Sequence, residues 1–401
     1  MATRAAGQTG GGEAAGEYWS EALKSFLDHI PVSSVSGALQ PSPSPALEIK
    51  LDGSVPDAID SMYHSNVAGA VIVDDVRTSF GKFVDRDIGF LEFPSLLLWA
   101  LEELDNMENG PGDKNSDLLS CLKQHPRIAE TKIAWLSKLF LWEPFFPVRS
   151  HDTLFHAMLL FSKHRRINVV PVVESMNSSV TRFVTQNAVM ELLLTSSGLE
   201  WLDKIADKQL SEFRFYASKP ISVYSDQTLA DALHILSKEK IGIAVIDRKT
   251  RCLIGSILCS ELYRLLDDNS LFRNRKTLIA EEFMKLKRKV EDNSTENSPA
   301  ADVQSVLSLR PGQSKTTDRP VTNRKSDTLK QAMEKLTASR SSCSFIVDEH
   351  GRVEGVVTAR DIISVFSPPC MDSRIDGGTF FSAALEQTGC RVEQGQMIQN
   401  S

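Results

Sequence analysis

Apolar and polar positions follow a regular order near the end of the chain, between Val321 and Val365. Residues 344–347 and 353–357 are apolar runs separated by a polar turn with a glycine, a pattern typical of a β-hairpin. Apolar residues at helical spacing precede the hairpin from Thr328 and follow it from Thr358. The segment therefore predicts a short strand, a helix, two strands and a second helix.

The same order recurs three more times along the chain. Each copy opens its first helix with a hydroxyl residue, an apolar residue, two further residues and an alanine. An acid follows the next strand 19 to 21 residues later. The openings are Ser54–Ile59, Thr153–Met158, Thr228–Leu233 and Thr328–Met333, and the acids are Asp74, Glu174, Asp247 and Asp348. Because one such unit is too small to bury a core alone, the repeats must pack on one another.

The spacing of the openings predicts how the repeats pair. Repeats 2 and 3 start close together, whereas the gaps within the first and the last pair are longer. We therefore expect repeat 1 to pair with repeat 2 and repeat 3 with repeat 4, each pair burying its sheet faces. The predicted fold class is α/β (α+β), with four β-α-β-β-α repeats in two paired modules.

The repeats are predicted at 46–104, 141–198, 217–267 and 320–367. The other segments are predicted as a disordered N-terminus at 1–16, an amphipathic helix and linker at 17–45, a linker and helix at 105–140, a bridging helix at 199–210, a basic helix and mobile linker at 268–319 and a loose tail at 368–401. The N-terminal helix either packs on the body of the protein or docks a partner. The basic helix, at 273–290, is either a solvated helix or a patch for an acidic partner surface.

Composition excludes several function classes. A net charge of −7 argues against a general nucleic-acid binder. The apolar runs are too short for a membrane span. The six cysteines form no paired motif, so we expect reduced thiols and a cytoplasmic or nuclear location. No nucleophile, metal-ligand, kinase or phosphate-loop motif occurs, so we expect no enzyme activity.

The repeats, with the motif Gly355–Asp361 in the last one, resemble cystathionine β-synthase (CBS) domains. A chain with four of them is similar to the gamma regulatory subunit of AMP-activated protein kinase, and more closely to plant gamma and gamma-like subunits of the sucrose-non-fermenting-related kinase. The other segments that carry this resemblance are Asp28–Ser33, Gly89–Pro94, Trp142–Phe145 and Ile167–Val173.

The resemblance implies a non-catalytic regulatory subunit whose two CBS pairs form a flat disk. It implies a kinase catalytic (alpha) subunit and a beta-type scaffold as partners, with no nucleic acid and no membrane. No cofactor is required, and an adenine nucleotide (AMP, ADP or ATP) is the ligand implied between the repeats. The alternative is a free-standing CBS-domain adenylate sensor that regulates another enzyme. Four repeats in one chain complete a disk without a second copy, which favours the gamma-like subunit.

The resemblance also points to candidate nucleotide-binding residues. In the family, the Asp that ends the motif bonds ribose and the hydroxyl residue helps to hold phosphate, which implies Asp361 and Thr358. A helix N-terminus attracts anions, which suits that role. The same pair is also an ordinary helix cap, so both interpretations stay open.

The other repeats depart from this motif. Repeat 3 has Glu261 in place of the Asp and Leu258 in place of the hydroxyl, and repeat 2 has Thr185 followed by Ala188. Repeat 1 has Glu92 and Ser95 at the two positions. Glu261 and Thr185 therefore complete the set of candidate residues.

Family members often carry a His-Arg pair that faces the phosphates. Ser342–Cys343 and Asn168–Val169 stand at those positions here. Nearby cations either substitute for the pair or are solvated surface charge; they are His164, Arg165, Arg166 and Lys240.

Overall fold

The computed structural model describes residues 24–35, 46–73, 87–106, 116–140, 146–164, 167–173, 180–213, 215, 220–239, 241–293, 307–310, 319–367, 390–393 and 396–399. All four predicted repeats are present, each with a three-stranded sheet. In every sheet a short first strand pairs in parallel with the second strand, which forms an antiparallel hairpin with the third. The predicted fold class is therefore confirmed.

Three of the repeats contain the same five elements in the same order. Repeat 1 contains β1 (Glu48–Lys50), α2 (Val55–His64), β2 (Gly69–Val73), β3 (Asp87–Glu92) and α3 (Phe93–Asn106). Repeat 2 contains β4 (Val148–Arg149), α7 (Leu154–Lys163), β5 (Val169–Val173), β6 (Val180–Thr185) and α8 (Gln186–Thr195). Repeat 4 contains β10 (Thr322–Asn323), α14 (Leu329–Ser339), β11 (Cys343–Val347), β12 (Val353–Thr358) and α15 (Ala359–Phe366).

Repeat 3 departs from this plan at its end. Its regular part contains β7 (Ser222–Tyr224), α10 (Leu229–Glu239), β8 (Gly242–Ile246) and β9 (Leu253–Leu258). The second helix is replaced by three short pieces: η5 (Cys259–Glu261), α11 (Arg264–Asp267) and α12 (Asn269–Arg273). The helix restarts because Asp268 adopts an extended conformation and its carboxylate accepts the N–H of Ser270 at 2.8 Å, which makes Asp268 an N-cap.

The hydroxyl residue that opens each repeat is the N-cap of its first helix. The hydroxyl oxygen accepts the backbone N–H three residues later, at 3.1 to 3.3 Å in the four repeats. The four cap residues are Ser54, Thr153, Thr228 and Thr328. Capping accounts for the sequence pattern, because the first N–H groups of a helix have no partner within the helix.

A second set of bonds completes each cap from outside the repeat. The residue after the cap donates its N–H to a carbonyl in one of the connecting segments, and that segment donates an N–H back. The donor and acceptor pairs are Val55 to Thr131 (3.1 Å), Leu154 to Ile30 (2.7 Å), Leu229 to Leu278 (2.8 Å) and Leu329 to Lys208 (2.9 Å). We call these four contacts the clasps. Each clasp satisfies a helix N–H that would otherwise need water.

The clasps exchange segments between neighbouring repeats. Residues 30–35, which precede repeat 1, clasp repeat 2, and the segment before repeat 2 clasps repeat 1. In the second half, the segment before repeat 3 clasps repeat 4, and the segment before repeat 4 clasps repeat 3. The two halves of the chain are therefore two copies of one interleaved module.

The clasping segments carry short helices that pack on the repeats. They are residues 24–29 with η1 (Val32–Ser34), then α4 (Leu118–Gln124), α5 (Pro126–Glu130) and α6 (Ile133–Phe140), then α9 (Glu200–Ala206) with η3 (Leu210–Glu212), and α13 (Ala280–Asn293). Leu27 is fully buried in the core of repeats 2 and 4. The helix at residues 24–29 therefore packs on the body of the protein.

Several expectations need correction in these segments. The basic helix begins at Ala280, not at residue 273, and the predicted bridging helix ends at Ala206. Within the predicted loose tail, β13 (Cys390–Glu393) and β14 (Gln396–Gln399) form an antiparallel hairpin. The predicted disordered N-terminus, Asp74, Glu174 and Trp142–Phe145 lie outside the described residues.

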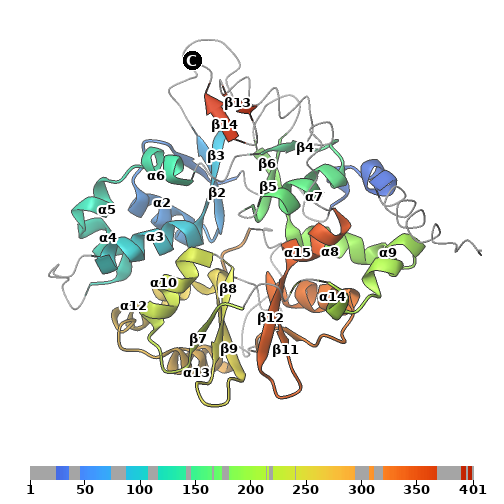
Figure 1. Cartoon of the computed structure of the whole chain (residues 1–401). Coiled ribbons are helices and arrows are strands. Elements are labelled where there is room, and N and C mark those ends of the chain that lie inside the picture. The colour runs from blue at the N-terminus through green and yellow to red at the C-terminus, as the bar shows by residue number, and fades with distance from the viewer. Residues whose placement is uncertain are drawn as a thin grey trace, which may run out of the picture.

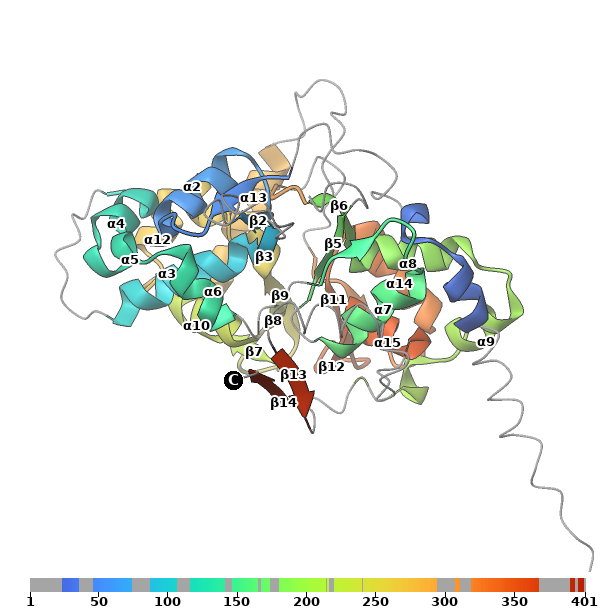
Figure 2. The ribbon, with the colours of Figure 1, turned by 90° about the horizontal axis from the view of Figure 1, so that it is seen from above.

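The four repeats surround a common centre (Figure 1). Repeats 1 and 2 bring their sheets together through Val71, Val73 and Val180, and repeats 3 and 4 do so through a cluster that includes Ala244 and Phe345. This is the pairing that the spacing predicts. The larger cores lie between helices and join repeat 1 to repeat 3 and repeat 2 to repeat 4. Figure 2 shows these two helical layers on either side of the sheets.

Residues 307–310 form a strap between repeats 1 and 3, inside the segment predicted as a mobile linker. Leu309 is 4% exposed, and its N–H donates to the carbonyl of Asn66 at 3.0 Å. The Arg310 guanidinium lies over the Tyr63 ring of repeat 1 and bonds the Asp267 carboxylate of repeat 3 at 2.7 Å. The strap therefore joins the two modules where the helices of repeats 1 and 3 meet.

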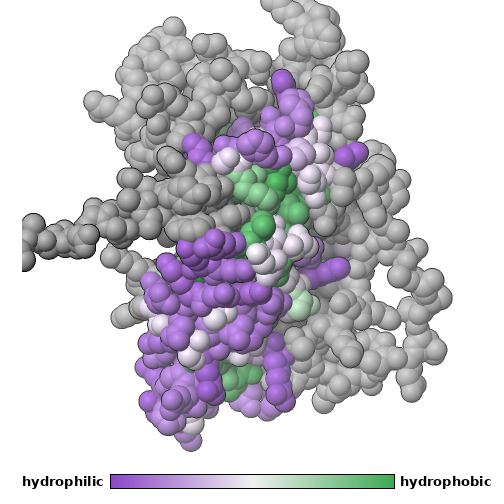
Figure 3. All heavy atoms as spheres, turned by 90° about the vertical axis from the view of Figure 1, so that its right-hand side faces the viewer, coloured by the Kyte–Doolittle hydropathy of each residue, from purple (hydrophilic) through white to green (hydrophobic). Residues whose placement is uncertain are grey.

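From the side of repeats 2 and 4, hydrophobic residues reach the surface in a band bordered by hydrophilic ones (Figure 3). Among the described residues, the large hydrophobic side chains classed as exposed are Trp135, Leu199 and Leu286. None of the helices described is both long enough and apolar enough to cross a bilayer.

Candidate functional site

The candidate pair of repeat 4 lies where β12 passes into α15. The Thr358 hydroxyl oxygen accepts the Asp361 N–H at 3.1 Å. Oδ2 of Asp361 accepts the backbone N–H of Thr358 at 3.0 Å and its hydroxyl at 2.7 Å. The two residues therefore form a reciprocal capping box, as the cap interpretation expects. Oδ1 of Asp361 has no hydrogen-bond partner among the described residues, so it can still accept a ligand hydroxyl.

The candidate acid of repeat 3 reaches the same interface from the other side. Glu261 accepts the Leu258 N–H at 3.1 Å, so it also caps a helical turn. Cys343 is the ladder partner of Thr358 in the β11–β12 hairpin and is 1% exposed. Burial, with a smaller contribution from the Glu261 charge, raises the pKa of the Cys343 thiol to about 12. The Cys343 thiol therefore lies beside Thr358 in the hairpin of repeat 4 and within electrostatic range of Glu261 of repeat 3.

The Cys343 thiol stands at a position where family members often carry a basic residue. A thiol with a pKa near 12 stays protonated and uncharged at neutral pH. A hypothetical Cβ on Gly242 of repeat 3 would lie 3.3 Å from its sulfur, so the thiol fills the space between the two strands. This position contributes no positive charge toward a phosphate.

Repeat 2 has the equivalent arrangement with repeat 1. Thr185 caps α8 by accepting the Ala188 N–H at 3.2 Å, and Val169 is its ladder partner. Asn168, next to Val169, donates its side-chain amide to the Glu92 carboxylate of repeat 1 at 3.1 Å. The interface of repeats 1 and 2 thus brings Glu92, Asn168 and Thr185 together.

The sequence did not predict the Asn168–Glu92 pair, although both positions were noted. Asn168 stands at the position of the basic pair, and Glu92 stands at the hydroxyl position of repeat 1. The sequence signal for this pair is an amide side chain at one of the two positions and a carboxylate at the other. Of the nearby cations, Arg165, Arg166 and Lys240 lie outside the described residues, and the His164 ring lies 4.7 Å from the Phe146 ring.

The sequence also gave no sign of the role of Arg360. Its guanidinium donates to the carbonyl of Phe161 at 3.2 Å and to the carbonyl of Ser162 at 2.7 Å. These carbonyls belong to the last turn of α7 in repeat 2. A residue inside the repeat 4 motif therefore bonds a helix of the other module.

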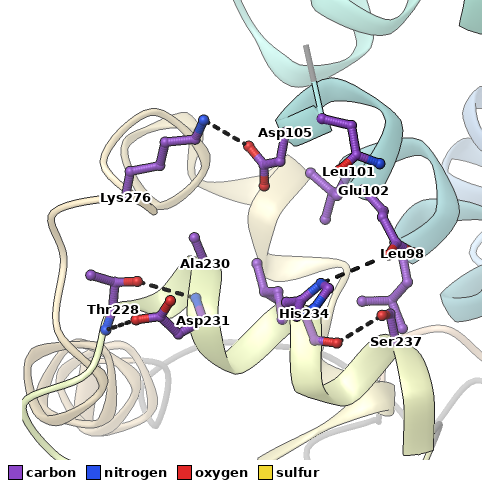
Figure 4. Close-up of a pocket in the computed structure, with 12 residues that line it drawn as sticks. Leu98, Leu101, Glu102, Asp105, Thr228, Ala230, Asp231, His234, Ser237 and Lys276 are labelled. Carbon is purple, nitrogen blue, oxygen red and sulfur yellow. Dashed lines mark hydrogen bonds and ion pairs between the residues drawn. The ribbon is translucent and has the colours of Figure 1, made fainter. Parts of the chain in front are cut away.

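A separate cavity of about 390 Å³ lies between α3 and α10, away from the strand ends (Figure 4). Apolar side chains that line the cavity include Leu98, Leu101 and Leu233. The lining also contains the carboxylates of Glu102, Asp105 and Asp231. Lys276 lies on Asp105 at 3.2 Å. The excess of negative charge makes this cavity a poor site for a phosphate. Among the described residues, no cluster of His, Cys, Asp or Glu could hold a metal ion.

The model of the CBS domain family matches residues 211–268 and 316–368, which cover repeats 3 and 4. These two repeats therefore match CBS domains. It is 25% identical over 372 residues to the SNF1-related protein kinase regulatory subunit gamma-1 of Arabidopsis thaliana, across 86% of this chain and 83% of that protein. It is 23% identical over 418 residues to the gamma-1-like subunit of the same plant, across 87% of this chain and 88% of that protein.

A solved structure shares the fold over most of the chain. An archaeal protein of Methanocaldococcus jannaschii, described as a homologue of the gamma subunit of AMP-activated protein kinase, superposes with a TM-score of 0.50 at 13% identity. The match covers 81% of this chain and 98% of that one. At this identity the likeness supports the fold, and the function rests on other grounds.

Proposed function

We propose that this chain is a non-catalytic, gamma-type regulatory subunit of a protein kinase of the SNF1-related, AMP-activated class. The observation that carries the proposal is the closed arrangement of four CBS repeats in one chain, similar over 86% of its length to a gamma-1 subunit. Because every repeat already has a neighbour on its sheet side and on its helix side, the ring needs no second copy of the chain. Its outer surface is therefore free to bind other subunits.

The proposed partners are a kinase catalytic (alpha) subunit and a beta-type scaffold. When the three chains are co-expressed, we expect this chain to co-purify with both partners at equal stoichiometry and to change the activity of the kinase. Size-exclusion chromatography with mass measurement tests the assembly. A chain that stays alone in the presence of both partners contradicts the proposal and favours a free-standing sensor.

The proposed ligand is an adenine nucleotide held at the interface of repeats 3 and 4. Oδ1 of Asp361 would accept a ribose hydroxyl. The hydroxyl of Thr358 and the N-terminus of α15 would face the phosphate, since a helix N-terminus favours negative charge. The carboxylate of Glu261 and the neutral Cys343 thiol place no cation there, so we expect AMP to bind better than ATP.

Asp361→Asn tests this site with little change of shape. The amide oxygen can still cap α15, but the atom that then faces the ribose is an NH2 group, which cannot accept a hydroxyl, and the negative charge is lost. A hydrogen bond to a charged group contributes about 1.5–3 kcal/mol, so we expect AMP binding to weaken about 10- to 100-fold. Isothermal titration of AMP, ADP and ATP into the purified chain measures the change.

Glu349→Gln is the matched control, because Glu349 is an exposed acid in the hairpin turn of the same repeat. It should leave AMP binding unchanged. If neither the unmodified chain nor Asp361→Asn binds AMP, then Thr358 and Asp361 are helix caps only. The repeats would then act as an assembly scaffold without a nucleotide.

A further inference from the structure

Arg360, inside the repeat 4 motif, makes side-chain hydrogen bonds to a helix of the other module. It lies between Thr358 and Asp361, in the first turn of α15. Its guanidinium reaches the carbonyls of Phe161 and Ser162, at the C-terminal end of α7 in repeat 2. A cation at this end of a helix is favourable, because the last carbonyls lack partners within the helix and carry partial negative charge.

The surroundings make this contact rigid. Phe161 and Ile363 are fully buried in the core that joins repeats 2 and 4, and α15 packs against both α7 and α8. The first turn of α15 is fixed on its other side by the capping box of Thr358 and Asp361. One turn of helix therefore holds the candidate ligand site at one end and the contact with repeat 2 at the other.

Ser162 provides a second arrangement for the guanidinium. Its side chain is fully buried, and its hydroxyl has no hydrogen-bond partner in the part of the chain that the structure describes. A buried hydroxyl without a partner is unfavourable, because it has lost its bonds to water and gained none in the protein. Because Arg360 already bonds the carbonyl of the same residue, a small shift of the guanidinium can bring an N–H to this hydroxyl.

We propose that Arg360 couples ligand binding at Thr358 and Asp361 to the end of α7 in repeat 2. The proposal rests on the proposed nucleotide site. A ribose hydroxyl on Oδ1 of Asp361 pulls on the carboxylate whose Oδ2 fixes the first turn of α15, and a shift of that turn moves Arg360 against the carbonyls of α7. Binding to one module therefore changes the stability of a helix end in the other.

Hydrogen exchange with and without AMP tests this coupling. Saturating AMP is expected to change the exchange rate of the amides at 161–164 about fivefold or more in the unmodified chain, the lower end of typical coupling between sites. In Arg360→Met, which keeps an unbranched side chain without the guanidinium, the same amides should no longer respond. Since coupling between two sites is reciprocal, Arg360→Met should also change the affinity of the chain for AMP by a similar factor.

Arg352→Met is the matched control, because Arg352 is an exposed arginine of repeat 4 with no ion pair among the described residues. Arg360→Lys keeps the positive charge and serves as a second variant in case Arg360→Met does not fold. It should restore part of the change in exchange that AMP causes at 161–164. An undiminished response of α7 in Arg360→Met overturns the coupling but leaves the nucleotide site intact. Failure of the unmodified chain to bind AMP overturns the nucleotide site, and the coupling with it.

Discussion

Deleting residues 1–35 is expected to unfold repeat 2 while repeat 1, the next repeat in the chain, keeps its structure. The clasp explains this result, since residues 30–35 bond the start of α7 and not the start of α2. Leu27, Val32 and Val35 are fully buried in the core of repeats 2 and 4. Each such side chain contributes about 1.5–3 kcal/mol, so the deletion removes about 4.5–9 kcal/mol. That loss is comparable to the whole stability of many domains.

Hydrogen exchange measured repeat by repeat distinguishes this outcome from a general loss of stability. Amides of β5 and α7 should lose protection first, and amides of β2 and α2 should retain it. Deletion of residues 1–23 is the control, because it leaves every residue of the clasp in place. A point substitution makes the same test at full length: Val32→Asp should act like the deletion, and Ser33→Asp, at a half-buried neighbour, should not. If repeat 1 loses protection before repeat 2, then residues 30–35 do not stabilise repeat 2 in the way that the clasp implies.

The repeats themselves could be predicted because their signals are local. A hydroxyl N-cap, an alanine four residues further on and a hairpin turn lie within one short segment, and each has a physical cause that the structure shows. The sheet pairing of repeats 1 with 2 and 3 with 4 followed from spacing alone. Fold class and pairing were therefore within reach of the sequence.

The exchange of clasps could not be predicted, because it depends on contacts between distant residues. Nothing in residues 30–35 marks Thr153, rather than Ser54, as the cap that they complete. The pairing of helices between repeats 1 and 3 and between repeats 2 and 4 is hidden for the same reason, since any apolar helix face fits several partners. The second helix expected in repeat 3 is broken because the cap at Asp268 outweighs the apolar pattern.

The candidate site shows a different limit. Thr358 and Asp361 make the bonds of a helix cap, and a nucleotide site of this family would use the same two side chains. One geometry satisfies both interpretations, and binding of AMP is the property that distinguishes them. The motif gives Arg360 no role of its own, because that role depends on where α7 of another repeat ends.

Phe345→Ala is expected to separate the sheets of repeats 3 and 4. Phe345 is 2% exposed and packs with Ala244, Ile246 and Cys343 in the cluster between the two sheets. Truncation of a buried phenylalanine costs about 3–5 kcal/mol, part of it from the cavity that remains. The effect should be near the upper end of this range, because the cluster is small and its strands are held in register on both sides.

Urea unfolding measures the loss, with Trp135→Ala as the matched control. Trp135 is 49% exposed on α6, far from this interface, so its truncation should cost about 1 kcal/mol or less. Because Phe345 lies on the same strand as Cys343, two residues from the ladder partner of Thr358, the loosened interface should also weaken AMP binding. Equal destabilisation by the two substitutions would mean that the sheets of repeats 3 and 4 contribute little to holding the module together. The helical core of repeats 2 and 4 would then have to hold repeat 4 in place by itself.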